Sequence, residues 1–174
     1  TRLLSGYAAR PEVSPDGTEI WFDKRTSSLS YSHQLFKMDI DGTDVVQLTS
    51  GPSGEAYTKS FGGFRDSDGR IVYTHGHGLR TADSTVPLSD ITVLTTGTFR
   101  TREYEQASWS PDGTRILHSR KFDDQPYDLW TCADDGTDFR QLTFDPANDI
   151  HADWGVLTPE PGSAVLVLAG MGGL

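Results

Sequence analysis

A four-residue phrase, Ser-Pro-Asp-Gly, occurs twice in this chain of 174 residues, and each copy is followed by Asp-Gly-Thr and then by Gln-Leu-Thr. The three phrases stand at 14–17, 41–43 and 47–49 in one copy and at 110–113, 135–137 and 141–143 in the other. The copies are 96 residues apart at the first phrase and 94 apart at the other two. Landmarks in a fixed order at a nearly constant offset indicate an internal structural repeat.

Half of that offset, about 48 residues, predicts a middle copy. Asp66-Ser67-Asp68-Gly69 stands at the expected place for its first phrase, and Val93-Leu94-Thr95 for its last. A period of this length made of short strands is typical of propeller blades, each a four-stranded antiparallel sheet that needs neighbours to bury its faces.

The repeated phrases have the chemistry of hairpin turns. Proline presets φ, aspartate bonds nearby backbone and glycine accepts positive φ, so Ser-Pro-Asp-Gly predicts a turn between first and second strands. Asp-Gly predicts another turn between third and fourth strands. Second strands are predicted at 19–23 and 115–118, third strands at 34–38 and 127–131, and fourth strands at 45–49 and 139–143.

The ends of the repeat region suggest partial blades. Residues 2–6 align with the end of a fourth strand at 46–51, and residues 141–155 align with the approach to a new first strand. We therefore predict an all-β fold of about three complete blades plus partial blades at both ends, an incomplete propeller or a fragment of one, with no amphipathic helix in residues 1–155.

These phrases resemble the WD-like repeats of the TolB-type β-propeller family, whose blades carry P-x-W-S-P-D-G, then D-x-D-G-T and Q-L-T. The resemblance covers residues 1–155 and is weakest in the middle copy, where Phe64-Arg65-Asp66 replaces Trp-Ser-Pro. Many relatives in this family are exported, so the resemblance implies an extracytoplasmic protein: periplasmic, secreted or at the cell surface.

Residues 156–174 differ in composition and form a second region, a linker and a partial apolar anchor segment. The thirteen residues from Gly162 onward carry no charge, but a transmembrane helix needs about 20. With Pro159, Glu160 and Pro161 before it, this tail resembles a truncated PEP-CTERM sorting signal, which implies an exosortase-type processing enzyme as a partner and membrane contact only through the tail of the precursor. The basic cluster of that signal is missing, and an apolar tail packed on the last blade is the alternative.

Two short clusters could hold a metal ion. His75 and His77 are spaced so that they would share one face of a strand and hold a transition metal, although no third ligand can be named and an exposed strand end is the alternative. Residues 39–44 and 134–138 have acidic spacing similar to a calcium loop, but both lack the later bidentate glutamate, and a hairpin turn explains them. No other cofactor is predicted.

Several functions are disfavoured by the sequence. A net charge of −10 without a basic stripe argues against nucleic-acid binding, and a single cysteine, Cys132, precludes an internal disulfide. The chain has no Gly-x-Ser-x-Gly motif, and His33, His118 and His151 stand alone, so no catalytic triad can be assembled. We expect all four tryptophans to pack in the core and not to form a platform for sugars.

The sequence favours an exported, non-enzymatic binding or scaffolding propeller that recognises a protein or a glycan at the cell surface. The alternative is an extracellular propeller enzyme, either a metal-dependent polysaccharide lyase or the propeller portion of a peptidase whose catalytic domain is absent. Recognition in propellers belongs to irregular loops, here 26–32, 76–87 and 122–126.

Overall fold

A computed structural model of the chain describes residues 7–26, 33–51, 59–96, 101–151 and 153–154, with 101–106 described as backbone only. Arg2 to Gly6, expected as the end of a preceding blade, and the sorting motif Pro159 to Pro161 lie outside these residues.

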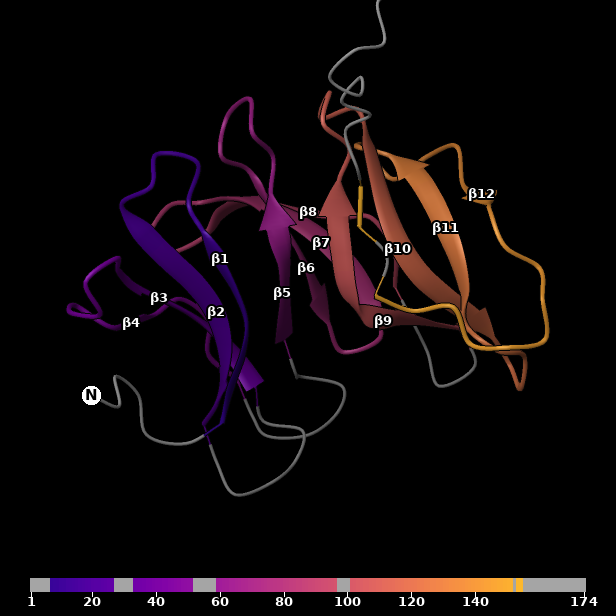
Figure 1. The fold of residues 1–174 in the computed structure, drawn as a ribbon, viewed down its shortest axis with the longest axis horizontal. Helices are drawn as coiled ribbons and strands as arrows, with labels where there is room; N and C mark the ends of the chain where they lie inside the picture. The colour runs from indigo at the N-terminus through magenta and orange to yellow at the C-terminus, as the bar shows by residue number, and fades with distance from the viewer. Residues whose placement is uncertain (1–6, 27–32, 52–58, 97–100, 152, 155–174) are drawn as a thin grey trace, which may run out of the picture.

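Twelve strands in the described residues form three four-stranded antiparallel sheets, one for each copy of the repeat (Figure 1). The first blade comprises β1 (Ala8–Val13), β2 (Glu19–Arg25), β3 (His33–Asp39) and β4 (Val46–Gln47). The second comprises β5 (Lys59–Phe64), β6 (Ile71–His75), β7 (Gly78–Asp83) and β8 (Ser89–Val93). The third comprises β9 (Thr101–Trp109), β10 (Arg115–Phe122), β11 (Asp128–Ala133) and β12 (Arg140–Gln141). The predicted all-β fold of consecutive blades is confirmed.

The Ser-Pro-Asp-Gly phrase is a hydrogen-bonded turn. Asp16 Oδ1 accepts hydrogen bonds from Ser14 Oγ (2.6 Å) and from the backbone N of Thr18 (3.0 Å), and Gly17 has a φ of 75°. In the third blade Asp112 accepts the corresponding bonds from Ser110 (2.6 Å) and Thr114 (3.1 Å). The phrase therefore recurs because it closes the same turn.

The Leu-Thr pair at the end of each copy closes its blade. In the first blade, Leu48 N donates to Leu35 O (2.8 Å), and Thr49 Oγ1 accepts from Leu35 N (2.9 Å). Leu142 and Thr143 make the same bonds to Leu129, and Leu94 and Thr95 make them to Leu79. We call this arrangement the leucine–threonine clasp. In the first and third blades the clasp follows strands β4 and β12 that are only two residues long, shorter than predicted, whereas β8 of the second blade has five residues.

Blades pack face to face through apolar side chains. Trp21 and Leu35 of the first blade join Phe61, Ile71 and Tyr73 of the second in one buried cluster. A second cluster joins the second and third blades and contains Val72, Leu79, Ala107, Trp109, Ile116 and Cys132. A Cβ on Gly62 would lie 2.6 Å from Ala107 O and 2.8 Å from Val72 O, so the second and third blades approach backbone to backbone.

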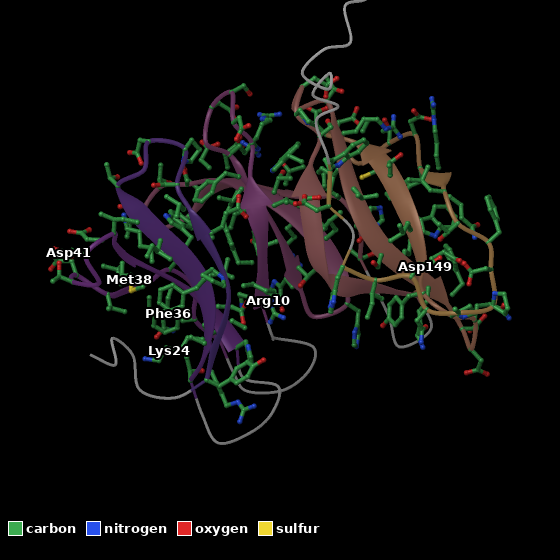
Figure 2. All side chains as sticks on the ribbon, in the orientation of Figure 1. Arg10, Lys24, Phe36, Met38, Asp41 and Asp149 are labelled. Atoms are coloured by element: carbon green, nitrogen blue, oxygen red, sulfur yellow. The ribbon has the colours of Figure 1, made fainter. Side chains whose placement is uncertain are left out.

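Each blade has two distinct faces set by strand register. Ile71 pairs with Ala82 and Tyr73 with Arg80, and this face of the second blade meets the first. In the first blade the matching positions are Ile20 with Met38 and Phe22 with Phe36. Phe22, Phe36 and Met38 form a third buried cluster on the side away from the second blade (Figure 2).

The chain after β12 descends along the outer edge of the third blade and returns toward its inner strand (Figure 1). Ile150, His151, Asp153 and Trp154, expected to lead into a new first strand, have irregular backbone instead. Trp154 Nε1 donates to Ser108 O (3.3 Å), which ties this segment to β9. The described residues contain no helix long and apolar enough to cross a membrane.

Candidate functional site

Strands β1, β5 and β9, which we call the inner strands of the three blades, and the segment that follows β12 surround a pocket with a volume of about 360 Å³. We call it the inner pocket. Its chemistry comes from carboxylates and aromatic rings: Glu12, Asp66 and Asp153, with Phe64, Trp109 and Trp154. These residues come from β1, β5, β9, the turn after β5 and the returning segment. No lysine or arginine is among the described residues that line it.

Glu12 is held at the floor of the inner pocket. Its Oε1 accepts a hydrogen bond from Phe64 N (3.2 Å), and the absence of a side chain on Gly63 leaves room for its carboxylate. Partial burial, the largest effect, raises the pKa of Glu12, and the carboxylates of Asp153 and Asp66 raise it further. Negative charge is therefore concentrated here, and a cation would relieve it.

Trp109 contributes a fixed ring and a hydrogen-bond donor. The guanidinium of Arg65 lies 4.8 Å from the centre of the indole ring and is itself paired with Asp68 (2.6 Å) and Asp134 (3.1 Å). Trp109 is 7% exposed, and its buried Nε1 has no hydrogen-bond partner within the described part of the chain. A ligand in the pocket could accept that bond.

The His75-Gly76-His77 cluster is a hairpin turn and not a continuous strand. His75 ends β6 and pairs with Gly78 of β7, so His77 lies in the two-residue turn, where Gly76 has a φ of 61°. The expected placement of both histidines on one strand face is therefore wrong, because Gly76 reverses the chain between them.

The surroundings of His75 have two opposite effects on its ability to bind a metal ion. Burial, and after it the positive charges of Lys59 and Arg80, lower the pKa of His75 from 6.5 to about 4. The imidazole is then neutral and able to ligate near pH 7, but the same cations would repel a metal. Among the described residues, no group of three or more His, Cys, Asp or Glu is arranged to hold a metal ion. A metal at His75 and His77 stays a prediction.

The two calcium-like segments form turns. Asp41 Oδ1 accepts hydrogen bonds from Thr43 N (2.9 Å) and Thr43 Oγ1 (2.7 Å), and these bonds lower the pKa of Asp41. Asp135 makes the same pair of bonds with Thr137. The turn interpretation accounts for these aspartates, and calcium binding stays a prediction.

The remaining histidines lie in three different environments. His33 Nδ1 is 2.7 Å from Asp23 Oδ2, His118 packs edge-on against Phe139, and His151 lines the inner pocket. Sequence reasoning did not single out Glu12, Asp66 or Asp153. The available signal was their place in the repeat: Glu12 precedes the first turn phrase, Asp66 begins the middle one, and Asp153 lies in the predicted approach to a new first strand. First strands of a propeller converge on one axis.

Comparison with protein-family models and with curated proteins gives no match. Solved structures do match. A candidate TolB from Agrobacterium tumefaciens is 15% identical with a TM-score of 0.64, over 81% of this chain and 51% of that one. TolB from Acinetobacter baumannii is 21% identical with a TM-score of 0.58, over 82% of this chain and 33% of that one. An oligogalacturonate lyase from Vibrio parahaemolyticus is 15% identical with a TM-score of 0.54, over 82% of this chain and 40% of that one.

At these identities the likeness shows the fold, which is that of a TolB-like β-propeller. The chain spans about half the length of the Agrobacterium protein and smaller shares of the other two. The arc of three blades thus corresponds to part of a propeller.

Proposed function

We propose that this chain is an extracytoplasmic, non-enzymatic binding module whose inner pocket holds a lysine or arginine side chain of a partner protein. The observation that carries this proposal is the gathering of Glu12, Asp66 and Asp153 in a pocket with aromatic walls. Carboxylates attract a cationic side chain, and aromatic rings stabilise the same cation through their negative faces. A backbone carbonyl of the partner protein, next to that lysine or arginine, could accept a hydrogen bond from Trp109 Nε1.

Two sequence features support the proposed location outside the cytoplasm. The blades resemble those of a family with many exported members, and Pro159, Glu160 and Pro161 resemble a sorting signal. An exosortase-type enzyme is then the processing partner, and the binding module is delivered to the cell surface.

Calorimetric titration with pentalysine tests the proposed function, with pentaserine as the uncharged comparison. We expect pentalysine to bind, and binding to weaken as salt rises because the carboxylates are solvent-accessible. A double variant, Glu12→Gln with Asp66→Asn, should weaken binding by about tenfold, which corresponds to losing charge contacts worth about 1.4 kcal/mol. Lowering the pH should also weaken binding, beginning at a higher pH than for an ordinary glutamate, because protonation of Glu12 removes its charge.

Asp124→Asn is the matched control, because Asp124 is exposed and lies outside the pocket. It should bind pentalysine nearly as the unaltered protein does. Equal binding by the double variant and by Asp124→Asn, or equal binding of pentaserine and pentalysine, would contradict the proposal.

A further inference from the structure

A second cavity, which we call the outer groove, lies at the edge of the third blade and has a volume of about 430 Å³. It is formed by the β10–β11 connection, the outer two strands and the segment that follows β12. The residues that matter here are Phe122, Asp128, Trp130, Gln141, Phe144 and Asp145. One of the irregular loops in which recognition was expected, 122–126, forms part of its wall.

The outer groove lies on the side of the third sheet that faces the second blade. Trp130 pairs with His118 and Asp128 with Arg120, in the same alternation as Cys132 with Ile116. Ile116 and Cys132 pack on the second blade. A blade added after the third would meet the opposite side of this sheet, where Leu117 and Leu129 point. Such a blade would therefore not pack on the face of the sheet that bears the outer groove.

The aromatic floor of the groove is held in place. Phe122 and Trp130 contact edge to face with ring centres 5.6 Å apart. The Arg120 guanidinium lies 4.9 Å from the Phe122 ring and 4.8 Å from the Phe139 ring. Beside this floor, the Phe144 ring is 75% exposed. A fixed floor with one exposed ring suits a ligand that stacks an apolar face.

The returning segment that borders the groove is also fixed. Tyr127 N donates to Asn148 Oδ1 (2.9 Å), and Asp149 N donates to Tyr127 O (2.6 Å). Asp149 lies against the third blade, at the place labelled in Figure 2. The wall thus needs no ordering when a ligand arrives.

Two buried polar atoms of groove-lining residues have no hydrogen-bond partner within the described part of the chain: Asp128 Oδ1, an acceptor, and Trp130 Nε1, a donor. The other carboxylate oxygen of Asp128 accepts from Gln141 Nε2 (3.0 Å), which fixes the direction of the carboxylate. Buried polar atoms of this kind are costly unless something bonds to them. Both atoms are covered by protein, so a ligand bonds to them only where a covering side chain shifts, and it must then supply both a donor and an acceptor.

We propose that the outer groove binds a neutral polysaccharide. The apolar face of a pyranose ring stacks on Phe144, and its hydroxyl groups donate to Asp128 Oδ1 and accept from Trp130 Nε1. A proline-rich peptide could stack on the rings, but its proline residues offer only carbonyl acceptors and would leave Asp128 unsatisfied. An acidic polysaccharide would be repelled by Asp128, Asp145 and the net charge of −10. The proposal is independent of the inner pocket.

The test is calorimetric titration of the full chain with cellohexaose and mannohexaose as neutral probes, hexagalacturonate as the acidic probe and hexaproline as the peptide probe. We expect at least one neutral hexasaccharide to bind. Phe144→Ala should weaken that binding by about tenfold, the loss expected for one aromatic contact. Trp130→Phe keeps a ring but removes the N–H donor and should weaken it severalfold.

Ile91→Ala is the matched control, because Ile91 is an exposed apolar residue of the second blade, 50% exposed and away from the groove. It should bind as the unaltered protein does, and thermal unfolding of each variant verifies that it is folded. The proposal is overturned if neither neutral probe binds, if Phe144→Ala binds as Ile91→Ala does, or if hexagalacturonate or hexaproline binds more tightly than the neutral probes. Pentalysine binding at the inner pocket is measured separately, so the two proposals fail independently.

Discussion

Among single side chains, His75 has the environment with the clearest consequence for pH. It ends β6 next to Lys59 and Arg80, and its pKa falls from 6.5 to about 4. Between these values the unfolded chain binds a proton that the folded chain does not. Stability must therefore be lost as the pH falls from 6.5 toward 4 and be fully present above 6.5.

We predict that His75→Asn makes the free energy of unfolding less sensitive to pH in this window, as measured by urea denaturation. The difference in free energy of unfolding between the variant and the unaltered chain should be clearly smaller than the full change in the pKa of His75 implies. The reason is that His75 is only half-buried and solvent screens the charges of its neighbours. His151→Asn, at an exposed position, is the control. A pH profile of His75→Asn that matches that of the unaltered chain would contradict this account of the low pKa.

At the residue scale the sequence was a good guide to turns and a poor guide to sites. Asp16 and Asp112 were identifiable because proline, aspartate and glycine act on backbone only a few residues away. Trp130 was expected in the core because its spacing matches that of strand residues, yet it is only half-buried and lines the outer groove. Whether this strand position is covered depends on how far the second blade extends over the third, which local sequence does not encode.

Strands of the first blade are joined by a buried ionic group. Asp23, on β2, has a fully buried side chain that accepts two hydrogen bonds from Arg10, from Nε at 2.5 Å and Nη2 at 2.8 Å. The Nδ1 atom of His33, on β3, lies 2.7 Å from Asp23 Oδ2, the oxygen that also accepts from Arg10 Nη2. Arg10 has a φ of 52° within the bulge of β1, which lets its side chain reach Asp23.

Asp23→Ala should lower the free energy of unfolding by about 3–5 kcal/mol, because it removes the buried carboxylate that Arg10 and His33 both contact. The double variant Arg10→Met with Asp23→Leu should be less damaging than Asp23→Ala, since it removes both charges of the pair together. Asp39→Ala, at an exposed strand end, is the control. Equal stability of Asp23→Ala and Asp39→Ala in urea would show that the ionic group does not join the strands.

The predicted ends of the strands agree with the structure where a turn between neighbouring strands sets them, and they differ elsewhere. β2, β3, β10 and β11 extend a few residues past their predictions at one or both ends, because pairing continues beyond the apolar positions. The inner pocket was not predictable, since Glu12, Asp66 and Asp153 belong to segments that are far apart in the sequence. The fold brings together β1, the turn after β5 and the segment after β12, which carry these three residues.

At the scale of the whole molecule, stability depends on close contact between blades. Gly62→Ala would place a methyl group against Val72 O of its own blade and Ala107 O of the third blade, and the second contact is relieved only if the two blades move apart. We expect a loss of about 1–3 kcal/mol in the free energy of unfolding, the usual cost of overpacking. The adjacent Gly63→Ala is the control, because its methyl group would meet the flexible side chain of Glu12. A smaller loss for Gly62→Ala than for Gly63→Ala would contradict this description of the interface.

The leucine–threonine clasp has a consequence for how a gene of this kind can change length. Each clasp is made within a single blade, between its third strand and the residues that follow its fourth strand. Successive blades then present the same two kinds of face in the same register. A duplication that inserts one whole repeat would therefore create two ordinary interfaces, whereas an insertion that ends mid-repeat would leave a clasp without its threonine. Selection can add or delete blades as units while the loops that bind ligands diverge.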